Sequence, residues 1–278
     1  MPEVTSFDGT EIYYDIHRKH EQFLVFVHGA GGDLNAWKKE RAHFHRKGYS
    51  TLAVDLRGHG LSERPKASKS YVLDSFSKDV RMVLKKERIT SFVMVGHCFG
   101  GMVTINFHRL FPSLAEGYVL IDTSHKAPQQ LNFIFEKFPF ITNKILTHLE
   151  RYQKAMGEAP KSHVDHETFK GTGDWNPRRI YSDVTHTSLA SWLFTYKQIA
   201  SFDGTDTLTS MKKPVIVIEG ERDSIFSVKT AKEIQKLVKK SILRILPKEN
   251  HMVVISNPKA IVVEVDRFLS AIGFKTQK

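Results

Sequence analysis

One short segment of the chain combines a nucleophile with the glycines that a sharp turn needs. In the segment Gly96-His97-Cys98-Phe99-Gly100-Gly101, a glycine stands two residues from Cys98 on either side, and the apolar run 91–95 precedes it. A strand, a strained turn and a helix in this order would hold Cys98 at the tip of the turn, where larger flanking side chains would collide with the facing backbone. Cys98 is also the only cysteine in 278 residues. A buried, unreactive cysteine is the alternative, but the motif favours a nucleophile.

A nucleophile of this kind needs a base, and the base needs an acid that orients it. Asp223 follows the apolar run 215–218, and His251 lies in the loop after the run 242–246. Functional groups at the carboxyl ends of parallel strands meet at one edge of a sheet, so we expect Cys98, Asp223 and His251 on the same rim. Asp122 directly follows the run 117–121 and is the alternative acid.

The other histidines do not form a second recognisable site. His28 and His59 lie in glycine-rich loops whose turns they are expected to stabilise, and His125 is interpreted as a loop residue rather than a pocket residue. Four more lack the cysteine or carboxylate spacing of a metal site, namely His148, His163, His166 and His186. The segment 29–32 fits neither a phosphate-binding loop nor a dinucleotide fingerprint. The sequence therefore predicts no metal and no cofactor.

Strands and helices alternate over most of the chain. A hairpin with an Asp8-Gly9 turn is predicted at 4–16, and buried strands follow at 23–27, 50–54, 91–95, 117–121, 214–219 and 242–246. Amphipathic segments predict helices at 34–47, 76–87, 99–110, 228–238 and 258–272. This pattern predicts an α/β fold with a mostly parallel, twisted sheet and helices on both faces.

The character of the chain changes between residues 124 and 206. This stretch has no convincing buried strand, and helical segments are expected at 131–140, 145–156 and 189–202. We therefore expect a core formed by 1–123 and 207–278, with 124–206 as a helical insertion.

Composition excludes several classes of protein. With 41% hydrophobic residues the chain can bury a large core, and no apolar run reaches the length of a membrane helix. The formal net charge is +11, but the lysines and arginines are spread along the chain without a nucleic-acid-binding motif, so we expect a solvated basic surface and no nucleic-acid partner. The first residues show no secretory signal, and one cysteine excludes an internal disulfide, so a cytoplasmic protein without integral membrane association is expected.

Five landmarks in this order resemble the α/β-hydrolase fold superfamily, in particular its capped esterases and lipases. They are His28-Gly29-Ala30-Gly31-Gly32, the segment 55–62, the Gly96–Gly101 elbow, Asp223 and His251. The resemblance covers nearly the whole chain and implies that 124–206 is a cap over the active site. Most such proteins have serine at the position of Cys98, whereas polyhydroxyalkanoate synthases share the form G-x-C-x-G-G.

This reading implies a hydrolase of the carboxylesterase type that works through a covalent acyl-enzyme. The helix after Cys98 would favour its thiolate, His251 would move the proton, and Asp223 would orient His251. The backbone amides of Phe99 and Ala30 would bind the oxyanion. Aromatic and apolar residues of the insertion suggest a small-molecule substrate with a hydrophobic acyl group, namely Phe133, Phe135, Phe138, Phe140, Trp192, Leu193 and Phe194. An acyltransferase and a non-catalytic ligand-binding protein are the alternatives.

Overall fold

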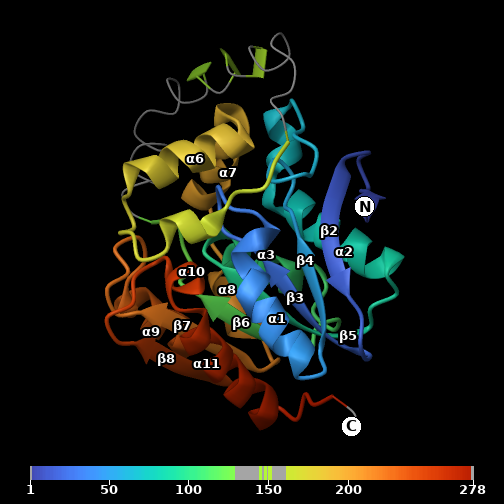
Figure 1. Ribbon diagram of the computed structural model, residues 1–278, viewed down its shortest axis with the longest axis vertical. Coiled ribbons are helices and arrows are strands. Elements are labelled where there is room, and N and C mark those ends of the chain that lie inside the picture. Colours follow the sequence, from blue (N-terminus) through green and yellow to red (C-terminus); the bar gives the residue numbers. More distant parts are fainter. Residues whose placement is uncertain (1, 129–143, 146, 149, 152–160, 277–278) are drawn as a thin grey trace.

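Eight strands form one sheet at the centre of the molecule (Figure 1). The computed structural model describes residues 2–128, 144–145, 147–148, 150–151 and 161–276. The strand order is β1-β2-β4-β3-β5-β6-β7-β8, in which only the pairs β1–β2 and β2–β4 are antiparallel. The strands are β1 (Glu3–Thr5), β2 (Glu11–His17), β3 (Gln22–Val27), β4 (Ser50–Val54), β5 (Ser91–His97), β6 (Gly117–Ile121), β7 (Val215–Gly220) and β8 (Ser241–Leu246). The predicted mostly parallel sheet is confirmed.

The continuous apolar runs form strands because both faces of the sheet are covered. In β3, Phe23, Val25 and Val27 pack into the core on one face, while Leu24 and Phe26 pack into the core on the other. Each alternate side chain therefore enters a different hydrophobic core, and no position in the middle of the strand is left to water.

Helices cover the two faces (Figure 1). Side chains of α1 and α11 pack on one face, and those of α2, α3, α8 and α9 pack on the other. Their bounds are α1 (Lys38–Arg46), α2 (Leu73–Lys86), α3 (Phe99–Leu110), α8 (Thr205–Ser210), α9 (Val228–Leu237), α10 (Val253–Ser256) and α11 (Pro258–Ala271). Within the described ranges, no helix has both the length and the apolar character needed to cross a lipid bilayer.

Two local predictions need correction. The hairpin turns through Ser6 to Thr10 rather than through two residues, because Gly9 donates to the carbonyl of Ser6 and Ser6 donates to that of Thr10. The predicted helix at 34–47 begins as a 3₁₀ turn, η1 (Leu34–Trp37), which Asp33 caps by accepting from Asn35 N at 2.8 Å. The α-helix starts only at Lys38.

The described part of the insertion lies across the carboxyl edge of the parallel strands (Figure 1). It contains η3 (His166–Phe169), α6 (Pro177–Thr187) and α7 (Leu189–Ala200). Of the predicted helices, 189–202 is present as α7, whereas 131–140 and most of 145–156 lie outside the described residues. Two histidine–aspartate pairs anchor the segment to the core: His163 Nε2 lies 2.7 Å from Asp55 Oδ2, and His166 Nε2 lies 3.0 Å from Asp33 Oδ1.

Glu40 in α1 is fully buried, and in the described part of the chain neither of its carboxyl oxygens has a hydrogen-bond partner. Burial raises the pKa of Glu40 to about 8. Between the ordinary pKa of glutamate and pH 8, the Glu40 carboxyl therefore holds a proton in the folded state that it has released in the unfolded state. The free energy of unfolding falls as the pH rises through this range. Glu40→Met should remove this dependence. The free energy of unfolding of the variant minus that of the parent should therefore be about 2–4 kcal/mol larger at pH 8 than at pH 5.

The measurement is urea unfolding of both proteins at the two pH values. Glu21→Gln is the matched control, because Glu21 is exposed. A stability difference between Glu40→Met and the parent that does not change with pH would contradict the prediction.

Candidate active site

Cys98 stands at the turn between β5 and α3, in a backbone conformation that few residues other than glycine adopt. Its φ is 54° and its ψ is −120°. The neighbouring glycines are needed for close approach, because a Cβ at Gly96 would collide with the carbonyl of Gly100 and one at Gly100 would collide with that of Val27. The strained turn is fixed by Cys98 N, which donates to Ile121 O at 3.0 Å, and it leaves the Cys98 side chain partly exposed.

His251 and Asp223 meet Cys98 at this edge of the sheet. His251 Nδ1 lies 2.7 Å from Asp223 Oδ2, and the Cys98 side chain is close enough to His251 to raise the pKa of the imidazole. The other oxygen of Asp223 accepts from Ile225 N at 2.7 Å and Phe226 N at 2.9 Å. The carboxylate is thereby held with one oxygen toward the imidazole, which fixes both the tautomer and the orientation of the ring.

The charges of this group determine how His251 titrates. Burial disfavours the imidazolium, but the charges of Asp223 and Cys98, together with the hydrogen bond to Asp223, outweigh burial, so the pKa of His251 lies well above its ordinary value. An imidazole with a strong affinity for a proton can take one from a thiol and hold it close to the sulfur.

Two backbone amides lie beside Cys98. Phe99 begins α3, so its N–H has no carbonyl partner within the helix. Ala30 lies in the turn Gly29–Gly32, which is closed by Gly32 N donating to Gly29 O at 3.2 Å. A Cβ placed on Gly29 would lie 3.1 Å from Cys98 Cβ, so this turn packs directly against the cysteine. Among the described residues neither amide donates to a backbone carbonyl in a turn or loop, which leaves both for an oxyanion.

The alternative acid, Asp122, lies close by but is not hydrogen-bonded to His251. Its Oδ1 accepts from Gly220 N at 2.8 Å, while the buried Oδ2 has no hydrogen-bond partner in the described ranges. One oxygen each of Asp122, Glu219 and Asp223 lie within 4.8 Å of one another. Burial, followed by the neighbouring carboxylates, raises the pKa of Asp122 well above its ordinary value and that of Glu219 to about 10. Asp223 differs from the other two carboxyl groups in its hydrogen bonds, since its oxygens contact Ile225 N, Phe226 N and His251 Nδ1.

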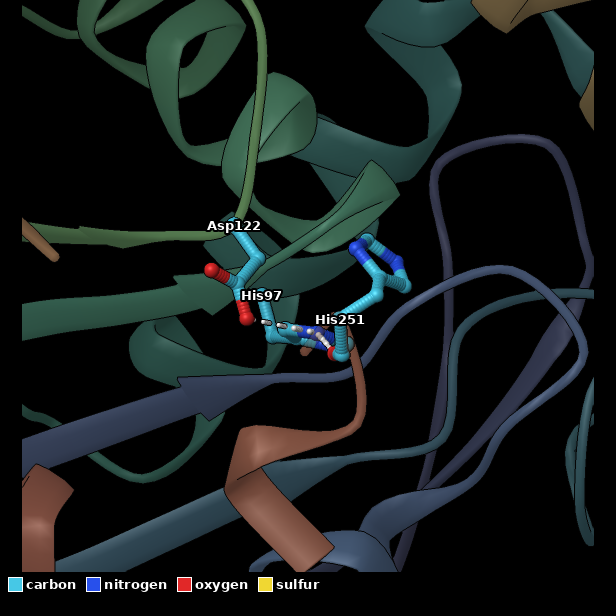
Figure 2. A group of neighbouring side chains, drawn as sticks. All are labelled: His97, Asp122 and His251. Atoms are coloured by element: carbon cyan, nitrogen blue, oxygen red, sulfur yellow. Dashed lines mark hydrogen bonds and ion pairs between the residues drawn. The ribbon is translucent and has the colours of Figure 1, made fainter. Parts of the chain in front are cut away.

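His97 connects Asp122 to the loop of His251, as Figure 2 shows. Its Nε2 donates to the main-chain carbonyl of His251 at 2.9 Å and lies 4.0 Å from Asp122 Oδ2. Burial, and then the charge of His251, lowers the pKa of His97, so the ring is neutral and has a single N–H. Atoms of His97, Asp122 and His251 are close enough together for a metal ion, but His97 Nε2 and His251 Nδ1 already form hydrogen bonds. The hydrogen bond from His97 holds the main chain of His251 in position.

Asp174, which sequence reasoning missed, joins the 124–206 segment to the loops that carry Asp223 and His251. Its Oδ1 accepts from His251 N at 3.0 Å, and its Oδ2 accepts from Ser224 N at 2.9 Å and Ser224 Oγ at 2.7 Å. Asn250 Nδ2 adds a bond to Thr172 O at 3.1 Å. A residue of the 124–206 segment therefore helps to fix the main chain of His251 and the residue next to Asp223.

Replacing Asp174 should loosen the loops that hold His251 and Asp223. Because Asp174→Ala leaves the buried amide of His251 without its acceptor, we expect kcat for an ester substrate to fall by about 10- to 100-fold, corresponding to a bond to a charged group. Asp174→Asn retains one acceptor oxygen, so its kcat should lie between that of the parent protein and that of Asp174→Ala.

The comparison is steady-state kinetics of both variants and of Asp206→Ala, whose side chain is exposed. Equal kcat values for Asp174→Ala and the Asp206→Ala control would show that the bridge does not affect the reaction.

Residues of α7 face the site from the insertion. Burial, followed by the charge of Cys98, raises the pKa of Tyr196, so this phenol is neutral and within electrostatic reach of the sulfur. Its ring lies 4.0 Å from that of Trp192. Phe194 points away into the core, where its ring centroid lies 5.2 Å from that of Tyr71. The other predicted pocket aromatics, at 133, 135, 138 and 140, lie outside the described residues.

His28 and His59 bond to loop main chain rather than to Cys98. His28 Nε2 accepts from Leu56 N at 3.0 Å, and His59 Nδ1 donates to Arg57 O at 3.0 Å. Burial lowers the pKa of His28 to about 3 and that of His59 to about 4, so both are neutral. His125 lies 3.8 Å from Glu233.

The sheet, the elbow and the order of its loops are those of a known family. A family model described as alpha/beta hydrolase fold matches residues 22–258. The chain belongs to the alpha/beta hydrolase fold family.

Individual relatives are distant. The chain is 22% identical over 249 residues to Protein ABHD8 of Homo sapiens, an alignment that covers 88% of this chain and 54% of that protein, so the chain spans about half the length of these curated relatives. It is 23% identical over 292 residues to a non-heme haloperoxidase of Rhodococcus erythropolis, with 98% and 100% covered. A solved carboxylesterase structure from Nitrososphaera gargenis superposes with a TM-score of 0.74 at 22% identity, covering 98% and 99% of the two chains.

Proposed function

We propose that this protein hydrolyses a carboxylic ester or a related acyl bond, with Cys98 as nucleophile, His251 as base and Asp223 as the orienting acid. The observation that supports this best is the position of His251, whose Nδ1 lies 2.7 Å from Asp223 Oδ2 and whose ring lies within electrostatic reach of the Cys98 sulfur. The strained turn at Cys98 and the amides of Phe99 and Ala30 supply the other parts of an acyl-transfer site.

The reaction proceeds in two halves. The thiol proton of Cys98 passes to His251 Nε2 while the sulfur attacks the substrate carbonyl, and the resulting oxyanion accepts from Phe99 N and Ala30 N. The carbonyl re-forms, the C–O bond breaks, and the leaving alkoxide takes the proton from His251. Water then attacks the thioester and gives a proton to His251, which returns it to the departing sulfur. The carboxylic acid leaves, and the free thiol is restored.

The proposal includes a division of the chain into a core and a cap. We assign the catalytic residues to a core formed by 1–123 and 207–278, and substrate selection to a cap formed by 124–206. The described part of 124–206 lies across the carboxyl edge of the parallel strands, and its Tyr196 is within electrostatic reach of Cys98. Because a catalytic thiol is inactivated by oxidation, a reducing compartment such as the cytoplasm suits this enzyme. The esterase named among the solved relatives is consistent with a small ester substrate.

Release of p-nitrophenol from short-chain p-nitrophenyl esters tests the proposal, together with the mass of the protein quenched early in the reaction. Steady turnover and one acyl group on the peptide that contains Cys98 are the expected results. A stoichiometric burst that resumes only with added alcohol, amine or thiol would indicate an acyltransferase instead. No release and no adduct would overturn the proposal and leave a ligand-binding protein.

A further inference from the structure

An ion pair in α6 lies against the same turn that packs on Cys98. Arg179 Nη1 donates to Asp183 Oδ2 at 2.6 Å, with 13% and 10% of the two side chains exposed. A Cβ placed on Gly31 would lie 2.6 Å from Asp183 Cβ, so Asp183 packs on this turn, two residues beyond the glycine that contacts Cys98. The pair therefore packs on the turn Gly29–Gly32, whose first glycine lies against Cys98.

The charges of this pair reach the residues around Cys98. After burial and the charge of His251, Arg179 contributes to the lowered pKa of His97. After burial, Cys98 and then Asp183 raise the pKa of Tyr196, whereas Arg179 lowers it. Tyr196 is thus within electrostatic reach of the sulfur and of both members of the ion pair. A substrate bound next to Tyr196 would meet a cation as well as apolar surface.

The guanidinium of Arg179 has a donor that the described residues do not use. Nη2 donates to Asp174 O at 2.5 Å and Nη1 to Asp183, but Nε is buried and has no acceptor among the described residues. A buried N–H without a partner is costly, and the Nε edge of a guanidinium matches the two oxygens of a carboxylate. Burial also raises the pKa of Asp183 to about 7, so near neutral pH part of the compensating negative charge is lost.

We propose that the acyl group of the substrate ends in a carboxylate, which Arg179 binds through its Nε edge while Cys98 attacks the ester carbonyl at the other end. This inference rests on the proposed hydrolase activity and names its substrate class, a half-ester of a dicarboxylic acid. Asp183 holds the guanidinium in place when the site is empty. The positive net charge of the chain favours the approach of such an anion.

The test compares the mono-p-nitrophenyl esters of glutaric, adipic and pimelic acids with neutral p-nitrophenyl alkanoates of matched length. We expect kcat/KM to favour the anionic member of at least one pair. Arg179→Met should then lower kcat/KM for that half-ester by about 30- to 100-fold and for the neutral ester by less than about 3-fold, which is the selectivity of a lost bidentate charged contact.

Three further variants complete the design. Arg178→Met is the matched control, since Arg178 is exposed on the same helix, and it should leave both activities unchanged. Arg179→Lys should recover part of the preference, because it keeps the charge and loses the planar fork. Asp183→Asn removes the competing carboxylate and should lower KM for the half-ester.

The outcomes separate the two proposals. Hydrolysis of the neutral esters without any preference for the half-esters would overturn the carboxylate site and leave the hydrolase intact. If Arg179→Met lowered kcat/KM equally for half-esters and neutral esters, the carboxylate site would also be overturned. Arg179 would then act only through its hydrogen bond to Asp174. No hydrolysis of either class by the parent protein would refute the proposed function itself.

Discussion

Replacing Cys98 with alanine should reduce turnover of p-nitrophenyl esters by about 10⁴-fold or more, since the loss of a nucleophile removes the acyl-enzyme route entirely. The residual rate would come from the oxyanion donors and from water. Because Cys98 is the only cysteine, iodoacetamide should also inactivate the protein in step with one alkylation. Both effects are read from the same stopped-flow and mass measurements.

Cys98→Ser is the informative control. Serine keeps a nucleophile within reach of His251, so this variant should still form an acyl-enzyme and release nitrophenol, although at a different rate. Full activity of Cys98→Ala would contradict the role of the thiol, and so would alkylation that leaves turnover unchanged.

Replacing Asp223 with asparagine should lower kcat by about 10³- to 10⁴-fold, because an amide at this position stabilises the wrong tautomer of His251 and cannot balance an imidazolium. Asp122→Asn should cost less than about 5-fold, since burial keeps the carboxyl of Asp122 protonated and an amide resembles a protonated carboxyl in shape and hydrogen bonding. The two variants carry the same substitution, aspartate to asparagine, at two carboxyl groups that lie close together. Each is therefore the control for the other.

The double variant decides the remaining case. If Asp122 can replace Asp223, the single Asp223→Asn variant will retain most of its activity and only the double variant will lose it. That result would contradict the assignment of Asp223 and would show that the acid is shared between the two strand ends.

The sequence was sufficient to predict features that depend on neighbouring residues or on the direction of parallel strands. The glycines around Cys98 are required by backbone contacts across one turn, and Asp223 and His251 end strands or begin loops at one edge, so their meeting follows from topology. Both Asp223 and Asp122 follow buried strands, and the sequence favours Asp223 with Asp122 as the alternative. The structure adds that His251 Nδ1 lies 2.7 Å from Asp223, whereas among the described residues Asp122 has no hydrogen bond to His251.

Residues of the insertion could not be predicted, because their roles depend on contacts distant in sequence. The helix α6 is largely polar, and the pairing of Arg179 with Asp183 looks in sequence like an ordinary i, i+4 surface pair. Its burial against Gly31 depends on how the insertion docks. Glu219 was likewise read as a strand residue, and only the fold shows that it lies beside two other carboxyls.

The bridge formed by Asp174 limits how this protein can be recombined with its relatives. If residues 124–206 select the substrate, as proposed above, exchange of that segment with the corresponding one of a relative is an obvious engineering route. Here the segment supplies the acceptor for the backbone amide of His251, so a chimera made at residues 124 and 206 would import a new specificity and lose part of the catalytic scaffold. A successful graft would have to retain residues 172–176 of this chain, or carry an acidic residue that reaches the same amide.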